Sequence, residues 1–127
     1  DGSTAFAAAI TTATGDYTGV SANHVKVFTA DATNGGYCEQ IRFKALGSNI
    51  ASVARIYINN GAAQTTATNN TFIGEQSLPI TTATDVACTA ELAYGIGFAL
   101  DPGFTIWVGL ATTVAAGWRV TAISGKY

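Results

Sequence analysis

The stretch from Gly36 to Gly61 constrains the fold more than any other part of the chain, because apolar and polar residues alternate in two runs within it. The positions on the apolar side are Ile41, Phe43, Ala45, Ala54, Ile56 and Ile58. A period of two puts successive side chains on opposite faces of a strand, so each run predicts a half-buried β-strand. The short connection Gly47-Ser48-Asn49 predicts that the two strands form an antiparallel pair. Half of the chain's six cations then lie on the outer face of this pair, namely Arg42, Lys44 and Arg55.

Further runs of the same kind predict an all-β chain of about eight strands without a long amphipathic helix. They lie near residues 24–30, 71–78, 86–92, 94–100, 104–111 and 117–124. Residues 94–100 are apolar enough to predict burial on both sides, and residues 6–10 suit either a short helix or a strand. Asp101-Pro102-Gly103-Phe104 has the central residues of a type II turn. Such spacing predicts an antiparallel β-sandwich, with a jelly roll as the best fit and an immunoglobulin-like sandwich as the alternative.

The composition favours a single domain, residues 1–127, that works in an assembly. Charged residues make up only 11% of the chain, well below the usual roughly 25%. A surface so poor in charge suggests cover by neighbouring molecules, since isolated domains normally rely on charge for solubility. No apolar stretch approaches the roughly 20 residues of a membrane-spanning helix. The six cations are scattered along the sequence, whereas nucleic-acid binders cluster theirs, so neither a membrane nor a nucleic acid is expected as a partner.

The histidine and cysteine content predicts no metal site. His24 is the one histidine, and alternation places it with Lys26 on the polar side of a strand, which predicts a surface residue. Cys38 and Cys88 fall on different strand faces by parity, which favours two reduced thiols, although a disulfide stays open because a bulge would shift the parity. Three possible ligands without paired spacing do not make a zinc site.

The acidic residues give no pattern of an enzyme. Glu39, Glu75 and Glu91 are the candidates for a pair of glycosidase carboxylates, but all three fall in predicted strands. An exposed acid there is the ordinary way to keep a sheet face soluble. The chain also has no Gly-x-Ser-x-Gly nucleophile motif. We therefore expect neither catalysis nor a cofactor.

Two aromatic residues could serve binding. Tyr57 and Trp107 fall out of phase with the apolar faces of their strands, so either could form a platform for a sugar ring. The favoured interpretation is that they pack beneath a neighbouring loop or a second copy of the chain, because aromatic residues are the usual anchors of protein interfaces.

The order of strand and turn signatures resembles a known family. These signatures are Val25-Lys26-Val27-Phe28-Thr29-Ala30, Asn34-Gly35, Ile41-Arg42-Phe43-Lys44-Ala45-Leu46-Gly47, Ala54-Arg55-Ile56-Tyr57-Ile58-Asn59-Asn60-Gly61, Leu100-Asp101-Pro102-Gly103-Phe104 and Trp118-Arg119-Val120-Thr121-Ala122-Ile123-Ser124-Gly125-Lys126-Tyr127. Over nearly its whole length the chain is similar to the capsid decoration, or cement, proteins of tailed bacteriophages, which have jelly-roll-like β-folds. Similar domains also occur in phage tail fibres.

This resemblance implies a virion structural protein that is assembled in the host cytoplasm. It implies a trimer on the outer capsid surface, at junctions between major capsid proteins, where it stabilises the shell. Residues 1–23 are expected to form an N-terminal contact segment ahead of the strands of residues 24–127. The expected contacts with a partner or subunit are Phe6, Tyr17, Tyr57 and Trp107. The alternative is a phage fibre module or a secreted carbohydrate-binding module.

Overall fold

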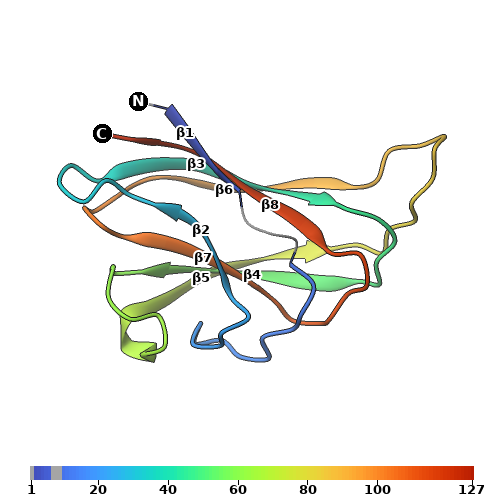
Figure 1. Cartoon of the computed structure of the whole chain (residues 1–127), viewed down its shortest axis with the longest axis horizontal. Coiled ribbons are helices and arrows are strands. Elements are labelled where there is room, and N and C mark those ends of the chain that lie inside the picture. The colour runs from blue at the N-terminus through green and yellow to red at the C-terminus, as the bar shows by residue number, and fades with distance from the viewer. Residues whose placement is uncertain (1, 7–9) are drawn as a thin grey trace.

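The computed structural model describes residues 2–6 and 10–127, and for residues 2–6 it describes only the path of the backbone. These ranges contain β-strands and one short 3-10 helix, η1 (Figure 1). The elements are β1 (Gly2–Phe6), β2 (Val25–Thr29), β3 (Gly36–Ala45), β4 (Ser52–Asn59), η1 (Ala67–Asn69), β5 (Asn70–Leu78), β6 (Glu91–Leu100), β7 (Thr105–Leu110) and β8 (Trp118–Lys126). The first strand therefore begins well before residue 24.

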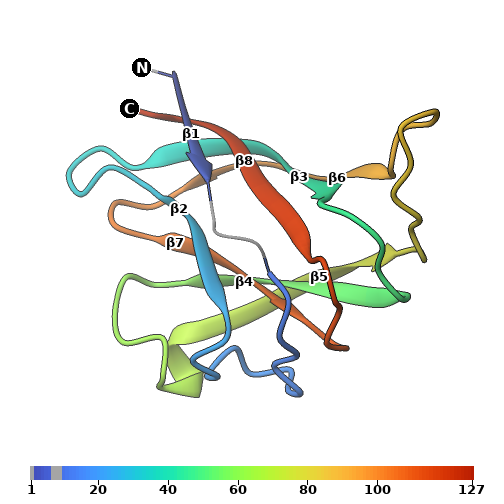
Figure 2. The same ribbon diagram turned by 45° about the vertical axis from the view of Figure 1, so that its right-hand side comes forward.

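Two antiparallel sheets pack face to face, which confirms the predicted β-sandwich (Figures 1 and 2). The first sheet has the strand order β1-β8-β3-β6 and the second has the order β2-β7-β4-β5. Among the described strands, only β4 and β5 are consecutive in the chain and neighbours in one sheet. Every other connection crosses from one sheet to the other, so the chain winds around a single core.

The core lies between the two sheets and is built from alternate residues of the strands. Its largest fully buried apolar side chains are Trp118, Phe43, Ile41, Ile56, Leu78, Ile106, Leu110, Val27, Val108 and Val120. The predicted inward faces of β3 and β7 are confirmed, and in β4 Ala54 and Ile56 are fully buried while Ile58 is partly buried. Burying apolar area at alternate positions is what fixes the faces of these strands.

The predicted antiparallel pairing of the two central strands is wrong. Strand β3 pairs with β6 and β8, whereas β4 pairs with β5 and β7 in the other sheet. The connection between them crosses the end of the sandwich, where the buried Asn49 ties it to other loops. The Asn49 side chain accepts hydrogen bonds from the backbone N–H groups of Ala116 (3.0 Å) and Gly117 (2.7 Å) and donates one to Thr81 Oγ1 (3.3 Å). The two apolar faces therefore meet across the core instead of lying side by side.

The region before and within β6 also differs from the prediction. Residues 82–90 form a loop outside regular strands, and Val86 in this loop is 92% exposed. The long loop between β5 and β6 projects away from the sandwich (Figures 1 and 2). Residues 94–100 were predicted to be buried on both sides, but β6 is an edge strand and Phe98 is 42% exposed. Glycine and alanine raise the apolar content of this strand without supplying side chains that drive burial.

The turn after β6 forms as its sequence predicts. Gly103 has a φ of 78°, which a type II turn requires at its third residue. The N–H of Phe104 donates to the carbonyl of Asp101 at 3.1 Å. This turn leads the chain from the first sheet into β7 of the second sheet.

Candidate functional site

The outer face of the second sheet carries a row of aromatic residues in register. Tyr57 of β4 lies opposite Phe72 of β5 on one side and opposite Trp107 of β7 on the other. Lys26 of β2 continues the row beyond Trp107. The prediction that Tyr57 and Trp107 point away from the core faces of their strands is thus confirmed. This row, which we call the aromatic row, is the candidate site.

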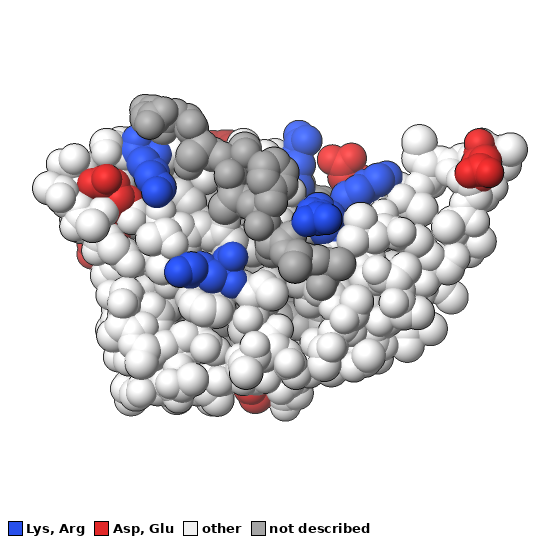
Figure 3. Space-filling view, in the orientation of Figure 1, with Lys and Arg blue, Asp and Glu red and all other residues white. Residues whose placement is uncertain are grey.

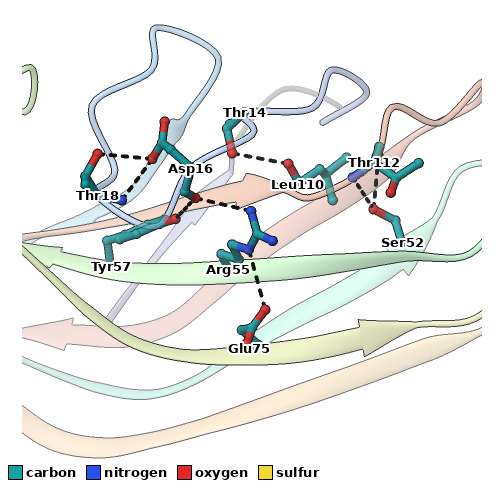
Figure 4. A network of polar contacts seen from close by, with 9 residues as sticks. All are labelled: Thr14, Asp16, Thr18, Ser52, Arg55, Tyr57, Glu75, Leu110 and Thr112. Carbon is teal, nitrogen blue, oxygen red and sulfur yellow. Dashed lines mark hydrogen bonds and ion pairs between the residues drawn. The ribbon is translucent and has the colours of Figure 1, made fainter.

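Residues 13–24, which we call the covering segment, run across this outer face, whereas Ile10 before them is buried in the core and pairs with Trp118 of β8. The backbone N–H of Thr14 donates to the carbonyl of Leu110 at 2.8 Å, and the Thr14 hydroxyl donates to the same oxygen at 3.2 Å (Figure 4). The contact is so close that a Cβ at position 109 would force its neighbours to shift, because it would lie 2.5 Å from His24 Cδ2 and 2.9 Å from Thr14 Cγ2. The N-terminal region is therefore packed on its own domain.

Asp16 forms the turn that covers Tyr57. Its carboxylate accepts hydrogen bonds from the N–H groups of Thr18 (3.0 Å) and Gly19 (2.9 Å). Partial burial raises the pKa of this carboxyl, but hydrogen bonds from Gly19 and Thr18 outweigh it, so the pKa lies below its usual value. The Asp16 carbonyl accepts hydrogen bonds from the Tyr57 hydroxyl (3.0 Å) and from Arg55 Nη1 (3.2 Å), as Figure 4 shows.

Tyr57 is consequently buried, with 1% of its surface exposed. Its ring meets the His24 ring edge to face, with 4.9 Å between centroids. Burial raises the pKa of the Tyr57 hydroxyl to about 12. A ring covered by its own chain does not form a sugar platform on this molecule, which agrees with the favoured interpretation that the ring packs beneath a neighbouring loop.

Tyr17 lies at the outside of the same cluster and is 59% exposed. The Arg55 guanidinium carbon is 4.0 Å from the centroid of the Tyr17 ring, which is the geometry of a cation–π contact. Arg55 also forms an ion pair with Glu75 of β5 at 3.4 Å. The ring of Phe72 packs against Tyr17 with 5.5 Å between centroids. Tyr17 is thus a supported aromatic ring with an open face.

The loop between β4 and β5, together with the first residue of β5, holds the covering segment from the other side. Gln64 Nε2 donates to the carbonyls of Gly19 and, at 3.0 Å, Ser21. Asn70 Nδ2 donates to the carbonyl of Thr18 at 3.0 Å. These bonds and those of Arg55 and Tyr57 fix the backbone that carries Tyr17.

The remaining two predicted contact residues are Trp107 and Phe6. Trp107 is half-buried, and its indole N–H donates to Thr105 Oγ1 at 2.9 Å. Phe6 ends β1, and its side chain lies outside the described part of the structure. Contact of Phe6, Tyr17, Tyr57 or Trp107 with a partner or subunit stays a prediction.

The prediction that His24 is a surface residue is wrong, because the side chain is only 4% exposed. Its Nδ1 lies 3.0 Å from the carbonyl of Ser21, and its ring packs on Tyr57 beneath the covering segment. Alternation placed His24 correctly on the outer side of the sheet, but that side is covered here. The two cysteines are free, with Cys38 buried and Cys88 exposed.

The three candidate glutamates lie on three different strands. Glu75 lies in the second sheet, whereas Glu39 and Glu91 belong to β3 and β6 of the first sheet. No group of three or more His, Cys, Asp or Glu side chains suited to a metal ion occurs among the described residues. No helix within residues 2–6 and 10–127 is long and apolar enough to cross a membrane.

Two surface features were not expected from the sequence. An open cleft of about 370 Å³ lies between the end of β3 and the projecting loop. It is lined by Ala45, Leu46, Gly47, Ala83, Thr84, Asp85, Ala87 and Thr89. The second feature is a cluster of cations on the outer face of the first sheet, formed by residues from β3 and β8 that are far apart in sequence. Only the strand register could have revealed this cluster.

No known protein family matches this chain, and no curated protein sequence is significantly similar to it.

Proposed function

We propose that this protein is a virion structural protein of a tailed bacteriophage that decorates and stabilises the outer surface of the capsid. In this role it acts as a trimer and binds across junctions between major capsid proteins. Many weakly attached copies would stabilise the assembled shell relative to its free parts by mass action. The proposal extends the sequence resemblance to decoration proteins.

The observation that carries the proposal is the strand order, β1-β8-β3-β6 in one sheet and β2-β7-β4-β5 in the other. We propose that the sandwich is a jelly roll, an eight-stranded fold of two sheets that contains two Greek keys. Viral capsid proteins and lectins both use this architecture. The order thus supports a virion protein, and it also keeps a carbohydrate-binding module as the second candidate.

The exposed Tyr17 ring favours a contact role for the N-terminal region. Arg55 and Phe72 support the ring from behind, so a partner would meet a side chain that has already lost much of its freedom. Aromatic residues held in this way are typical interface anchors. The same ring could stack on a sugar, so the alternative predicts the same residue.

The first test is the mass of the purified chain by light scattering coupled to size-exclusion chromatography. The proposal expects a stable trimer that cosediments with phage capsids prepared without their decoration protein. A monomer that does not cosediment overturns it. Binding on a glycan array that is lost in Tyr17→Ala, without a trimer, would establish the carbohydrate-binding alternative instead.

A further inference from the structure

Exposed apolar side chains gather in two loops at one end of the sandwich. Leu46 and Ile50, which are 45% and 56% exposed, belong to the loop between β3 and β4. Ile80 and Val86, at 72% and 92%, belong to residues 79–90, the loop between β5 and β6 that we call the projecting loop. Large apolar side chains in contact with water mark an interaction surface when they lie together rather than singly.

The two loops hold each other in place. Asn49 and Thr81 exchange backbone hydrogen bonds, with N–H to carbonyl distances of 3.2 and 2.9 Å. The Thr81 hydroxyl donates to the carbonyl of Gly47 at 2.8 Å, and the N–H of Ala83 donates to Ser48 Oγ at 2.9 Å. The base of the projecting loop is therefore fixed before any partner arrives, so binding there loses less conformational freedom.

The projecting loop carries both an apolar knob and a recess. Val86 is the knob, and it projects where nothing in its own chain covers it. The recess is the open cleft of about 370 Å³, whose walls include the small side chains of Ala45, Ala83 and Ala87. Val86 is not part of the cleft wall, although the residues on either side of it are. The chain thus does not place its own knob in its own cleft.

This end of the molecule is also nearly free of charge. The loops of residues 46–51, 79–90 and 111–117 contain one charged residue, Asp85. Figure 3 shows one acidic group on the projecting loop, with uncharged atoms around it. A strongly charged partner would bury charges here without counter-charges, which costs free energy. The surface that matches this end best is an equally uncharged and apolar one, and a second copy of the chain presents such a surface.

We propose that copies of this chain contact one another at this end, with Val86 of one copy seated in the cleft of another. Leu46, Ile50 and Ile80 extend the apolar contact around the seated side chain. Because the knob and the cleft lie on one loop, each copy can both insert a side chain and receive one.

This inference rests on the proposed function for the number of copies. In the proposed trimer each copy inserts Val86 into the next, and such a head-to-tail contact closes into a ring. The contact itself can be measured without a capsid. A dimer formed through the same loops would support this inference and remove the proposed trimer, so the two proposals can fail separately.

The first experiment measures self-association by light scattering over a range of protein concentrations. Val86→Ser removes the knob, and Ala87→Glu places a charge in the wall of the cleft. The matched control is Ala62→Glu, which adds the same charge at an exposed position in the loop between β4 and β5. All three positions are exposed, so the fold should be kept, and thermal melting checks this.

The second experiment locates the contact with a short reagent that links two thiols. Cys88 is exposed and lies two residues after Val86, whereas Cys38 is buried. If projecting loops meet neighbouring copies, the reagent should join folded copies through Cys88. The yield should fall in Val86→Ser, which keeps both cysteines.

We expect Val86→Ser and Ala87→Glu to raise the concentration for half-association roughly tenfold or more, and Ala62→Glu to change it by less than about twofold. A monomeric unaltered chain, equal weakening in the control, or unchanged association in the two test variants overturns the inference. Test variants that keep the oligomer but lose cosedimentation with capsids also overturn it and assign the loop to the capsid protein. An oligomer linked through Cys88 that does not cosediment with capsids supports the inference and removes the proposed function.

Discussion

Replacing Gly109 with alanine tests whether residues 13–24 pack on the second sheet as the structure describes. The added methyl would lie 2.5 Å from His24 Cδ2, 2.7 Å from His24 Nε2 and 2.9 Å from Thr14 Cγ2. Overpacking of this kind costs about 1–3 kcal/mol. Alanine returns about 0.4–1 kcal/mol by restricting the unfolded chain. The two effects predict a net loss of about 1–2 kcal/mol.

The assay is thermal unfolding, with Gly95→Ala as the matched control. A Cβ at Gly95 would meet nothing within 4 Å, and this glycine, like Gly109, lies within a strand and has no positive φ. For a domain of this size each kcal/mol shifts the melting temperature by roughly 3–5 °C. We expect Gly109→Ala to melt about 3–10 °C below the unaltered chain, with Gly95→Ala at or slightly above it.

A second comparison identifies the atoms responsible. In a His24→Ala background, Gly109→Ala should cost less, because the ring that the methyl meets is gone, and the difference is the coupling energy of the pair. If Gly109→Ala melts at or above Gly95→Ala, the covering segment does not lie against β7 and the reasoning is refuted.

Three further predictions concern single groups. Asn49→Ala should destabilise the chain by about 2–5 kcal/mol in denaturant unfolding, because the buried N–H of Gly117 and the partly buried N–H of Ala116 lose their acceptor. The exposed Asn60→Ala should cost under about 1 kcal/mol. Burial raises the pKa of Cys38 to about 11, so a thiol reagent should react only with Cys88 in the folded chain and with both cysteines in denaturant. If no thiol reacts in denaturant, the two cysteines form a disulfide and the prediction is wrong. The pKa of Tyr57 is raised from 10.0 to about 12, so the stability that the neutral hydroxyl contributes should be complete below pH 10.0 and lost as the pH rises through about 12. Tyr57→Phe should lack that loss, and identical alkaline unfolding curves for the two chains would contradict the burial of the Tyr57 hydroxyl.

The sequence predicted which faces of the strands are buried better than it predicted which strands are neighbours. Ile41, Phe43 and Ile56 are fully buried, as predicted. A period of two identifies these positions because alternate side chains of a strand share the face that packs on the core. The same pattern fits a hairpin and a crossing between sheets equally well. What separates the two is the connection around Asn49, whose hydrogen bonds to distant loops are not visible in a local pattern.

The candidate site shows the same limit on the outer faces. His24 and Tyr57 point away from the core as alternation requires, yet both are buried because residues 13–24 return over the second sheet. Lys44 and Arg119 look scattered in the sequence, and only the pairing of β3 with β8 brings them together. Non-local pairing decides both cases, and no single strand carries that information.

The two outer faces of the sandwich are therefore unequal, and this bears on where a partner binds. On the second sheet, the chain's own N-terminal region covers Tyr57, and Arg55 is paired with Glu75, which leaves Tyr17 as the exposed member of the cluster. On the first sheet, Arg42 of β3 is exposed and paired with Glu91, and Arg119 of β8 lies opposite Lys44. An acidic partner could form charge-assisted hydrogen bonds with the exposed guanidinium of Arg42 on the first sheet, whereas Tyr57 of the aromatic row is already covered within the molecule. If both faces are used, we expect charge on the first sheet to govern the association rate and its salt dependence, and Tyr17 on the second sheet to govern dissociation.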